Sequence, residues 1–192
     1  MKTNFRIFQS KAPLYIDQIR SLTYESYLEK GFISSNSDKR IDMYDKLDAL
    51  DQTRILIAEE ENKVVGSASI TIDGPEGLHT DIHFKKESDI IRAENKKLAT
   101  CWRFVIDRSY RNQISLSKNI IYSTYEILEK EGIEDLILWF SAKDIPFYIR
   151  MFNAKLVAIK EIQFNKKSFH SALLRTTTED MKQFLINSRM LK

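Results

Sequence analysis

Residues 98–131, LATCWRFVIDRSYRNQISLSKNIIYSTYEILEKE, decide the fold of this chain. The first ten are rich in aromatic and β-branched side chains, which favours a strand over residues 98–107. From Ile114 to Leu128, apolar side chains recur every three to four residues, which predicts a helix with one buried face that ends at Gly132. A strand that leads into an amphipathic helix predicts an α/β arrangement, in which the helix packs on a sheet.

Short strands and helices are predicted on both sides of this unit. Residues 54–58 and 64–72 are apolar runs separated by charged residues, which predicts two antiparallel strands. Residues 73–77 hold two of the five glycines and one of the three prolines, so they are predicted to form a turn. The other expected elements are strands over residues 4–9, 135–140, 155–164 and 168–175, and helices from Pro13 to near Gly31 and over residues 85–97, 144–152 and 178–189. This order predicts one α/β domain, residues 1–192, around a mixed sheet.

The composition is that of a folded domain without a strong charge bias. Hydrophobic residues make up 43% of the 192 residues, which is enough for a core. Lys and Arg number 30 and Asp and Glu 27, and the formal net charge of +3 gives no reason to expect a nucleic-acid partner. Because no apolar run approaches about 18–20 residues, stable membrane insertion is not expected. Nor does an apolar run of signal-peptide length follow the N-terminal charges.

The cysteine and histidine usage predicts neither a disulfide nor a metal site. Cys101 is the single cysteine, so no internal disulfide can form, and a reducing, cytoplasmic location is expected. Without an identifiable histidine partner, Cys101 is interpreted as a small buried thiol rather than a nucleophile. His79 and His83 lie four residues apart, but their segment includes Gly77 and is not predicted to be helical, which argues against a metal pair.

Three segments resemble, in this order, those of GNAT acyltransferases. Residues 98–131 are similar to the central strand, loop and helix of these enzymes. Within them, residues 110–118 (YRNQISLSK) occupy the place of a glycine-rich turn, where backbone N–H groups at a helix start hold the diphosphate of an acyl carrier. Residues 144–154 (DIPFYIRMFNA) resemble a later segment in which a short helix carries a tyrosine. The resemblance implies a GNAT-type mixed, mostly antiparallel sheet with helices on both faces.

A narrower resemblance, to bacterial N-acyl amino acid synthases and their autoinducer-synthase relatives, covers roughly residues 15–175. Residues 65–81 (VGSASITIDGPEGLHTD) are similar to their strand, Gly-Pro turn and following acidic residue. Residues 87–99 (ESDIIRAENKKLA) resemble the charged helix that precedes their central strand. Asp42 and Asp45 stand in a segment like the paired aspartates of the autoinducer synthases.

This family resemblance implies an N-acyltransferase. The acyl group passes from the phosphopantetheine thioester of an acyl-carrier protein, or less often from acyl-CoA, to the amine of an amino acid or related small molecule. Such a reaction requires a neutral amine, a polarised carbonyl and a protonated leaving thiolate, and it uses no metal. The implied partners are an acyl-carrier protein and a small-molecule amine. Five basic residues are predicted to gather at the carrier entrance, or else to form a solvated basic face: Lys96, Lys97, Arg108, Arg111 and Lys118.

The same resemblance implies candidate site residues. Tyr148 is the candidate general acid for the leaving thiol, with a hydrogen-bonded core tyrosine as the alternative. Asp42 and Asp45 would hold the acceptor amine, or else cap a helix or face solvent. The pantetheine slot is assigned to Phe104, Val105 and Ile106, and the phosphate site to Arg108, Arg111, Asn112, Gln113, Ile114 and Ser115.

Two positions at the expected catalytic centre depart from the family pattern. Thr100 stands where a glutamate is usual, three residues before Arg103, and threonine is not a base near neutral pH. Ser69 stands at the substrate-side position where autoinducer synthases carry an arginine. Arg103 itself is expected to bind the phosphate or to pair with Asp42 or Asp45.

These departures leave two alternatives to the leading hypothesis. The first is a small-molecule N-acetyltransferase that uses acetyl-CoA. It is less favoured, because Ile114 and Leu116 stand where glycines would allow a diphosphate to approach the backbone closely. The second is a catalytically degenerate GNAT-like module that binds an acyl carrier or a partner protein, which the residues at positions 100 and 69 favour.

Overall fold

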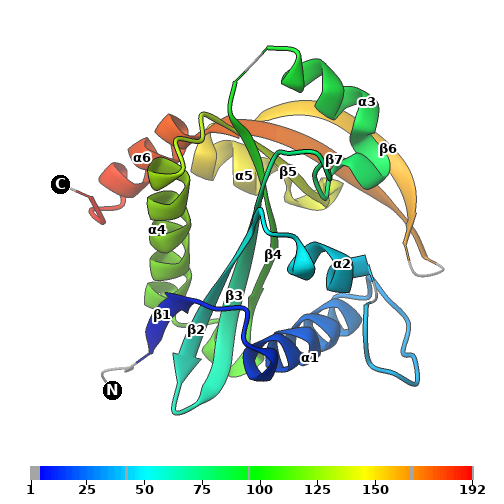
Figure 1. The fold of residues 1–192 in the computed structure, drawn as a ribbon, viewed down its shortest axis with the longest axis vertical. Coiled ribbons are helices and arrows are strands. Elements are labelled where there is room, and N and C mark those ends of the chain that lie inside the picture. The colour runs from blue at the N-terminus through cyan, green and yellow to red at the C-terminus, as the bar shows by residue number, and fades with distance from the viewer. Residues whose placement is uncertain (1–4, 42, 95, 165–166, 192) are drawn as a thin grey trace.

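The computed structural model describes residues 5–41, 43–94, 96–164 and 167–191, and a seven-stranded sheet runs through it (Figure 1). The strand order is β1-β2-β3-β4-β5-β7-β6, and all neighbours pair antiparallel except β4 and β5, which are parallel. The strands are β1 (Arg6–Gln9), β2 (Thr53–Glu60), β3 (Lys63–Ile72), β4 (Leu98–Ile106), β5 (Asp135–Ser141), β6 (Lys155–Phe164) and β7 (Lys167–Thr177). The helices are α1 (Pro13–Glu29), α2 (Met43–Ala49), α3 (Asp81–Arg92), α4 (Ile114–Lys130), α5 (Ile145–Phe152) and α6 (Thr178–Asn187).

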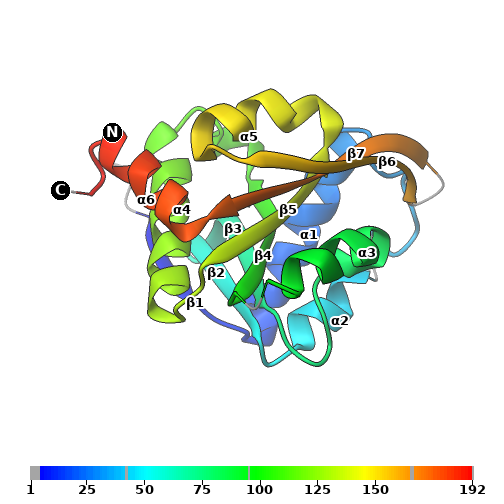
Figure 2. The same cartoon turned by 90° about the horizontal axis from the view of Figure 1, so that it is seen from above.

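Helices cover both faces of the sheet, as Figure 2 shows from above. In β2, Ile55 and Ile57 pack into a cluster with the buried side chains of α1. The alternate residues Leu56 and Ala58 pack into a second cluster with α4. Successive strand residues point to opposite faces, so a strand covered on both sides must be apolar at every position. This explains the uninterrupted apolar run of residues 55–58, and the expected strand pair is confirmed.

Helix α4 is anchored along its length by buried apolar side chains. Leu116, Ile120 and Leu128 are buried against the sheet, and Gly132, with φ of 65°, ends the helix in the left-handed region that favours glycine. Ile114, predicted on the buried face, is instead 69% exposed. It is the first residue of the helix and lies at its exposed end.

Two segments differ from the expectation. No element is predicted over the residues of α2, but they form a helix in which Tyr44 and Asp48 turn inward and are buried. Helix α3 begins at Asp81 rather than at residue 85, so His83 is helical. Within the described ranges, no group of three or more His, Cys, Asp or Glu side chains is placed to hold a metal ion.

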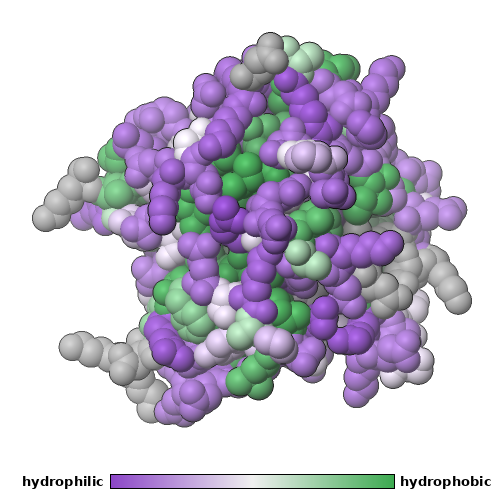
Figure 3. Space-filling model, viewed as in Figure 1, coloured by the Kyte–Doolittle hydropathy of each residue, from purple (hydrophilic) through white to green (hydrophobic). Residues whose placement is uncertain are grey.

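The basic residues expected at a carrier entrance are divided between the two ends of β4. Lys96 and Lys97 precede this strand, whereas Arg108 and Arg111 follow it. A strand of nine residues spans about 30 Å, so the predicted single cluster is wrong. The surface in Figure 3 is mainly hydrophilic, with smaller apolar areas between the polar side chains. In the part of the chain that is described, no helix is long and apolar enough to cross a bilayer.

Candidate active site

Strands β4 and β5 form a fork at the centre of the sheet. They pair only where residues 98–100 lie beside residues 135–137. Beyond these positions β4 continues beside β3 as far as Ile106, whereas β5 continues beside β7 as far as Ser141. The two strands therefore part after Thr100 and leave room between them for side chains and for a ligand.

A β-bulge lies on one arm of the fork. The register between β3 and β4 shifts between Ser67 and Ser69, so Arg103 and Phe104 have no direct partner in β3. Arg103 has φ of 50°, a left-handed conformation that costs a residue other than glycine about 1–3 kcal/mol. Such strain persists only where surrounding contacts hold it. Here the bulge places the Arg103 side chain in the interior and leaves Phe104 40% exposed.

An apolar pocket of about 320 Å³ lies on the α4 side of the fork. Its wall is built mainly from aliphatic, aromatic and methionine side chains: Ala68, Cys101, Trp102, Phe104, Arg111, Ile114, Ser117, Lys118, Ile121, Thr124, Leu136, Leu138, Phe140, Phe147, Tyr148, Met151, Phe152, Met181 and Phe184. Burial in such a wall is worth about 0.8 kcal/mol for each methylene group, which suits an acyl chain. Arg111 and Lys118 add basic charge beside the start of α4.

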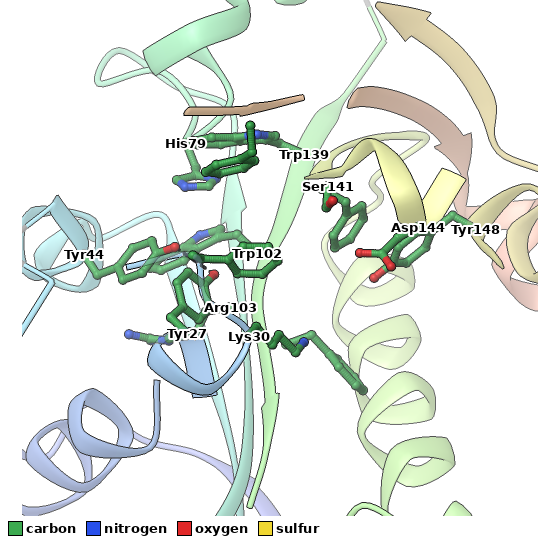
Figure 4. A pocket seen from close by; sticks show the side chains of 14 residues that line it. Tyr27, Lys30, Tyr44, His79, Trp102, Arg103, Trp139, Ser141, Asp144 and Tyr148 are labelled. Carbon is green, nitrogen blue, oxygen red and sulfur yellow. Dashed lines mark hydrogen bonds between the residues drawn. The ribbon is translucent and has the colours of Figure 1, made fainter. Parts of the chain in front are cut away.

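A second pocket, called here the aromatic pocket, has a volume of about 110 Å³ and receives residues from α1 and α2, on the other face of the sheet (Figure 4). Its lining residues are Tyr27, Lys30, Phe32, Tyr44, His79, Trp102, Arg103, Phe104, Trp139, Phe140, Ser141, Asp144, Tyr148 and Phe169. Trp102, Phe104, Phe140 and Tyr148 line both pockets, so the two cavities meet at the fork.

Tyr148 stands where the two pockets meet. Its ring, on α5, stacks on Phe140 of β5, with the ring centroids 3.8 Å apart and the planes 12° from parallel. Burial raises the pKa of its hydroxyl, and the nearby Asp144 raises it further. Tyr148 is therefore protonated at neutral pH, which is the state that a proton donor requires.

The Arg103 side chain is held in a buried network. Its guanidinium donates to both carboxylate oxygens of Asp48, at 2.8 and 2.6 Å, and to the hydroxyl of Ser69, at 2.6 Å. The expected partnership with Asp45 is wrong, since Asp45 pairs with Arg20 at 2.8 Å. Asp42 lies outside the described residues. Ser69 thus contacts the arginine of β4, and Asp48 is a site residue that the sequence interpretation missed.

Thr100 occupies the last paired position of the fork, opposite Ile137. It is fully buried, and its hydroxyl has no hydrogen-bond partner within the residues described. A threonine hydroxyl does not ionise near neutral pH, so Thr100 supplies no base at the position where the family resemblance implies a glutamate.

Of the three residues assigned to the pantetheine slot, only Phe104 lines the pockets. Val105 packs into the α1 cluster and Ile106 into the α4 cluster, both buried. Their side chains support the sheet from its two faces and do not form the wall of either pocket, and a pantetheine slot along the backbone of this part of the strand stays a prediction.

The phosphate-site candidates at the start of α4 also fall into two groups, those that line the apolar pocket and those that do not. Arg111 and Ile114 line the apolar pocket. Arg111 donates to the Glu29 carboxylate at 2.7 Å and to the Ile106 carbonyl at 3.3 Å. Gln113 stands at the N-cap of the helix. The remaining candidates, Arg108, Asn112 and Ser115, are exposed at this end of β4 and do not line either pocket.

Cys101 lines the apolar pocket, and burial raises the pKa of its thiol to about 12. A neutral thiol is a poor nucleophile. The interpretation of Cys101 as a small packing residue agrees with this position.

Comparison with known proteins identifies the family. Residues 18–174 match the family defined by N-acyl amino acid synthase FeeM. A search of curated proteins finds no match. The structure is similar to FeeM, an N-acyl amino acid synthase from uncultured soil microbes, with a TM-score of 0.80 and 15% identity over 98% of this chain and 99% of that chain.

More distant structural relatives share the fold. BjaI, a CoA-dependent acyl-homoserine lactone synthase solved with SAM and isopentyl-CoA, has a TM-score of 0.63 and 16% identity over 98% of this chain and 90% of that chain. A GNAT-family acetyltransferase from Staphylococcus aureus Mu50 has a TM-score of 0.61 and 11% identity over 91% of this chain and 99% of that chain. The predicted GNAT fold, with its mostly antiparallel sheet, is confirmed. Because the family match spans most of the sequence, this chain belongs to the FeeM family of N-acyl amino acid synthases and is an acyltransferase.

Proposed function

We propose that this acyltransferase moves a fatty acyl group from the thioester of an acyl-carrier protein to the amine of an amino acid or related small molecule. The observation that carries the proposal is the meeting of an apolar pocket and an aromatic, polar-rimmed pocket at Trp102, Phe104, Phe140 and Tyr148. A transferase must bring a donor and an acceptor to one point from separate sites, and these two cavities share one wall.

The donor enters from the α4 side in this proposal. The acyl chain lies in the apolar pocket, and the phosphate of phosphopantetheine lies near Arg111 and Lys118, at the start of α4, where the positive end of the helix dipole favours an anion. Ile114 and Leu116 leave less room for a diphosphate than glycines would, which favours a carrier protein over CoA. BjaI is CoA-dependent, so acyl-CoA is the alternative donor.

The acceptor occupies the aromatic pocket. Lys30 and Asp144 are exposed residues of its lining and offer opposite charges, as the carboxylate and ammonium of an amino acid require. The aromatic rings of the lining give an apolar surface for the rest of the molecule.

The residues at the fork then support acyl transfer. The amine nitrogen attacks the thioester carbonyl carbon, a C–N bond forms and the C–S bond breaks. The departing thiolate takes a proton from the Tyr148 hydroxyl. The bulge at Arg103 interrupts the β-ladder beside the carbonyl, and its backbone N–H groups are the proposed donors to the developing oxyanion.

The test is a donor comparison with the purified chain and a mixture of the twenty amino acids. Long-chain acyl-carrier protein and acyl-CoA of the same chain length are supplied separately, and both thiol release and the mass of the product are recorded. An N-acyl amino acid formed faster from the carrier protein supports the proposal. Turnover of acetyl-CoA alone would establish an N-acetyltransferase, and carrier binding without any turnover would establish a binding module.

A further inference from the structure

His79 is a buried polar residue that the steps above do not use. It is 4% exposed, lies between β3 and α3, and lines the aromatic pocket. Neither ring nitrogen has a hydrogen-bond partner within residues 5–41, 43–94, 96–164 and 167–191. Buried polar groups are satisfied in the great majority of cases, and an unmet one costs about 1–3 kcal/mol. His79 is therefore placed at a cost to stability, with both ring nitrogens covered by side chains and without a partner in the described residues.

The imidazole is held by rings that do not hydrogen-bond to it. It stacks between Trp102 of β4 and Trp139 of β5, with centroid distances of 5.4 and 4.6 Å and interplanar angles of 23° and 26°. These tryptophans stand two residues beyond the last paired positions of β4 and β5. His79 thus lies at the base of the fork, on the acceptor side (Figure 4).

Few side chains of the aromatic pocket can take a proton at neutral pH. Burial raises the pKa of Tyr27, Tyr44 and Tyr148, so their hydroxyls are already protonated. Arg103 and Lys30 are cations, which leaves His79 and Asp144. Asp144 is exposed at the rim, whereas His79 lies in the buried part of the pocket beside the fork. Burial keeps His79 neutral, with a pKa lowered to about 3, so a lone pair is available on its ring.

We propose that His79 accepts the proton of the acceptor amine, in place of the glutamate that Thr100 replaces. This inference rests on the proposed function. An amine N–H donates to the unprotonated ring nitrogen of His79, which lines the aromatic pocket, once the side chains that cover this nitrogen have moved aside. As the C–N bond forms, the nitrogen becomes acidic and its proton passes to His79. Tyr148 gives its proton to the leaving thiolate, and solvent later returns a proton from His79 to Tyr148, so the amide and the free thiol are the only products.

The test compares His79→Gln with His83→Gln. His83 lies four residues away and meets the edge of Trp139 at 4.8 Å, but it does not line either pocket. With the best amino acid acceptor, His79→Gln is expected to lower kcat at least about 100-fold, the lower range for loss of a general base. KM for the acyl donor stays unchanged, and His83→Gln keeps wild-type turnover.

Hydroxylamine is far less basic than the amine of an amino acid, so after attack its nitrogen loses the proton to water without a general base, and this acceptor separates proton transfer to His79 from a loss of folding. Thiol release with hydroxylamine is expected to be the same in His79→Gln and the wild type. Wild-type turnover of the amino acid by His79→Gln would overturn the inference and leave the proposed function intact. Equal loss with both acceptors would assign His79 a structural role. If the wild-type chain makes no N-acyl product, the proposed function and this inference fail together.

Discussion

Asp48 of α2 and Arg103 of β4 are 55 residues apart in the sequence and are joined by two hydrogen bonds in the interior of the protein. The Arg103 side chain is 0% exposed and the Asp48 side chain 4%. The pair fixes α2 against the bulge, and so it holds both Tyr44 and the strained backbone of Arg103 beside the aromatic pocket. This ion pair thus shapes the acceptor side of the fork.

Substitution of Asp48 by asparagine is expected to destabilise the chain strongly. It leaves the Arg103 guanidinium buried without a counter-charge, and breaking a buried ion pair typically costs about 3–5 kcal/mol. Asp45→Asn is the matched control, because Asp45 pairs with Arg20 near the surface, and an exposed pair contributes about 1 kcal/mol or less. Urea unfolding measures the loss of stability in each of the two variants. Equal, small losses would show that the Asp48 charge does not compensate Arg103.

The sequence predicts best those elements that depend on local pattern. The strand and helix of residues 98–131 are predicted well because their periodicity is set by neighbours within a few positions. Asp48 is missed for the opposite reason. Its segment is short and polar, and its inward side is defined only after a strand 55 residues later has been placed beside it. His79 is missed similarly, since its tryptophan neighbours come from two separate strands.

The role of Tyr148 as a proton donor predicts a loss in turnover without a loss in donor binding. Tyr148→Phe keeps the ring that stacks on Phe140 but removes the hydroxyl. Loss of a general acid lowers kcat by about 100-fold or more, while KM for the acyl donor is unchanged. Tyr122→Phe, on α4 and outside both pockets, is the control. Thiol release at saturating acceptor measures the effect, and a fully active Tyr148→Phe would exclude the role.

The apolar pocket predicts that acyl-chain preference is set by its wall. Met151 is partly exposed and lines this pocket, so tryptophan at this position is expected to shorten the space without disturbing the core. Each methylene group that no longer fits lowers kcat/KM about tenfold or more. The preferred acyl chain of Met151→Trp should therefore be shorter in a series of donors. Met190→Trp, which does not line either pocket, should keep the wild-type preference.

Docking of an acidic carrier protein predicts a role for the charges at one end of β4. Arg108 follows this strand and its side chain is 84% exposed. Arg108→Glu is expected to raise KM for acyl-carrier protein about tenfold at low salt, because charge complementarity speeds association. Lys96→Glu lies at the other end of β4 and should have little effect. Acyl-pantetheine lacks the carrier surface and should not distinguish the variants. Equal KM values for Arg108→Glu and the wild type would place the docking surface elsewhere.

The burial of His79 predicts a loss of stability in mild acid. Desolvation, followed by the charges of His83 and Arg103, lowers the pKa of His79 to about 3, whereas an unfolded histidine titrates near pH 6.5. Below pH 6.5 the unfolded chain therefore binds a proton that the folded chain does not. The free energy of unfolding falls by about 1.4 kcal/mol for each pH unit in this range.

Between pH 7 and pH 5 this contribution amounts to about 2 kcal/mol. The free energy of unfolding is measured with urea at both pH values. From pH 7 to pH 5 it should fall by that amount more in the wild type than in His79→Gln, which lacks the titrating ring. His83→Gln should follow the wild type more closely, because His83 is only half-buried. Equal losses in the wild type and His79→Gln would mean that the buried imidazole is protonated as readily as a histidine in water. Such a histidine would be a cation in acid, where the amine could no longer pass its proton to it.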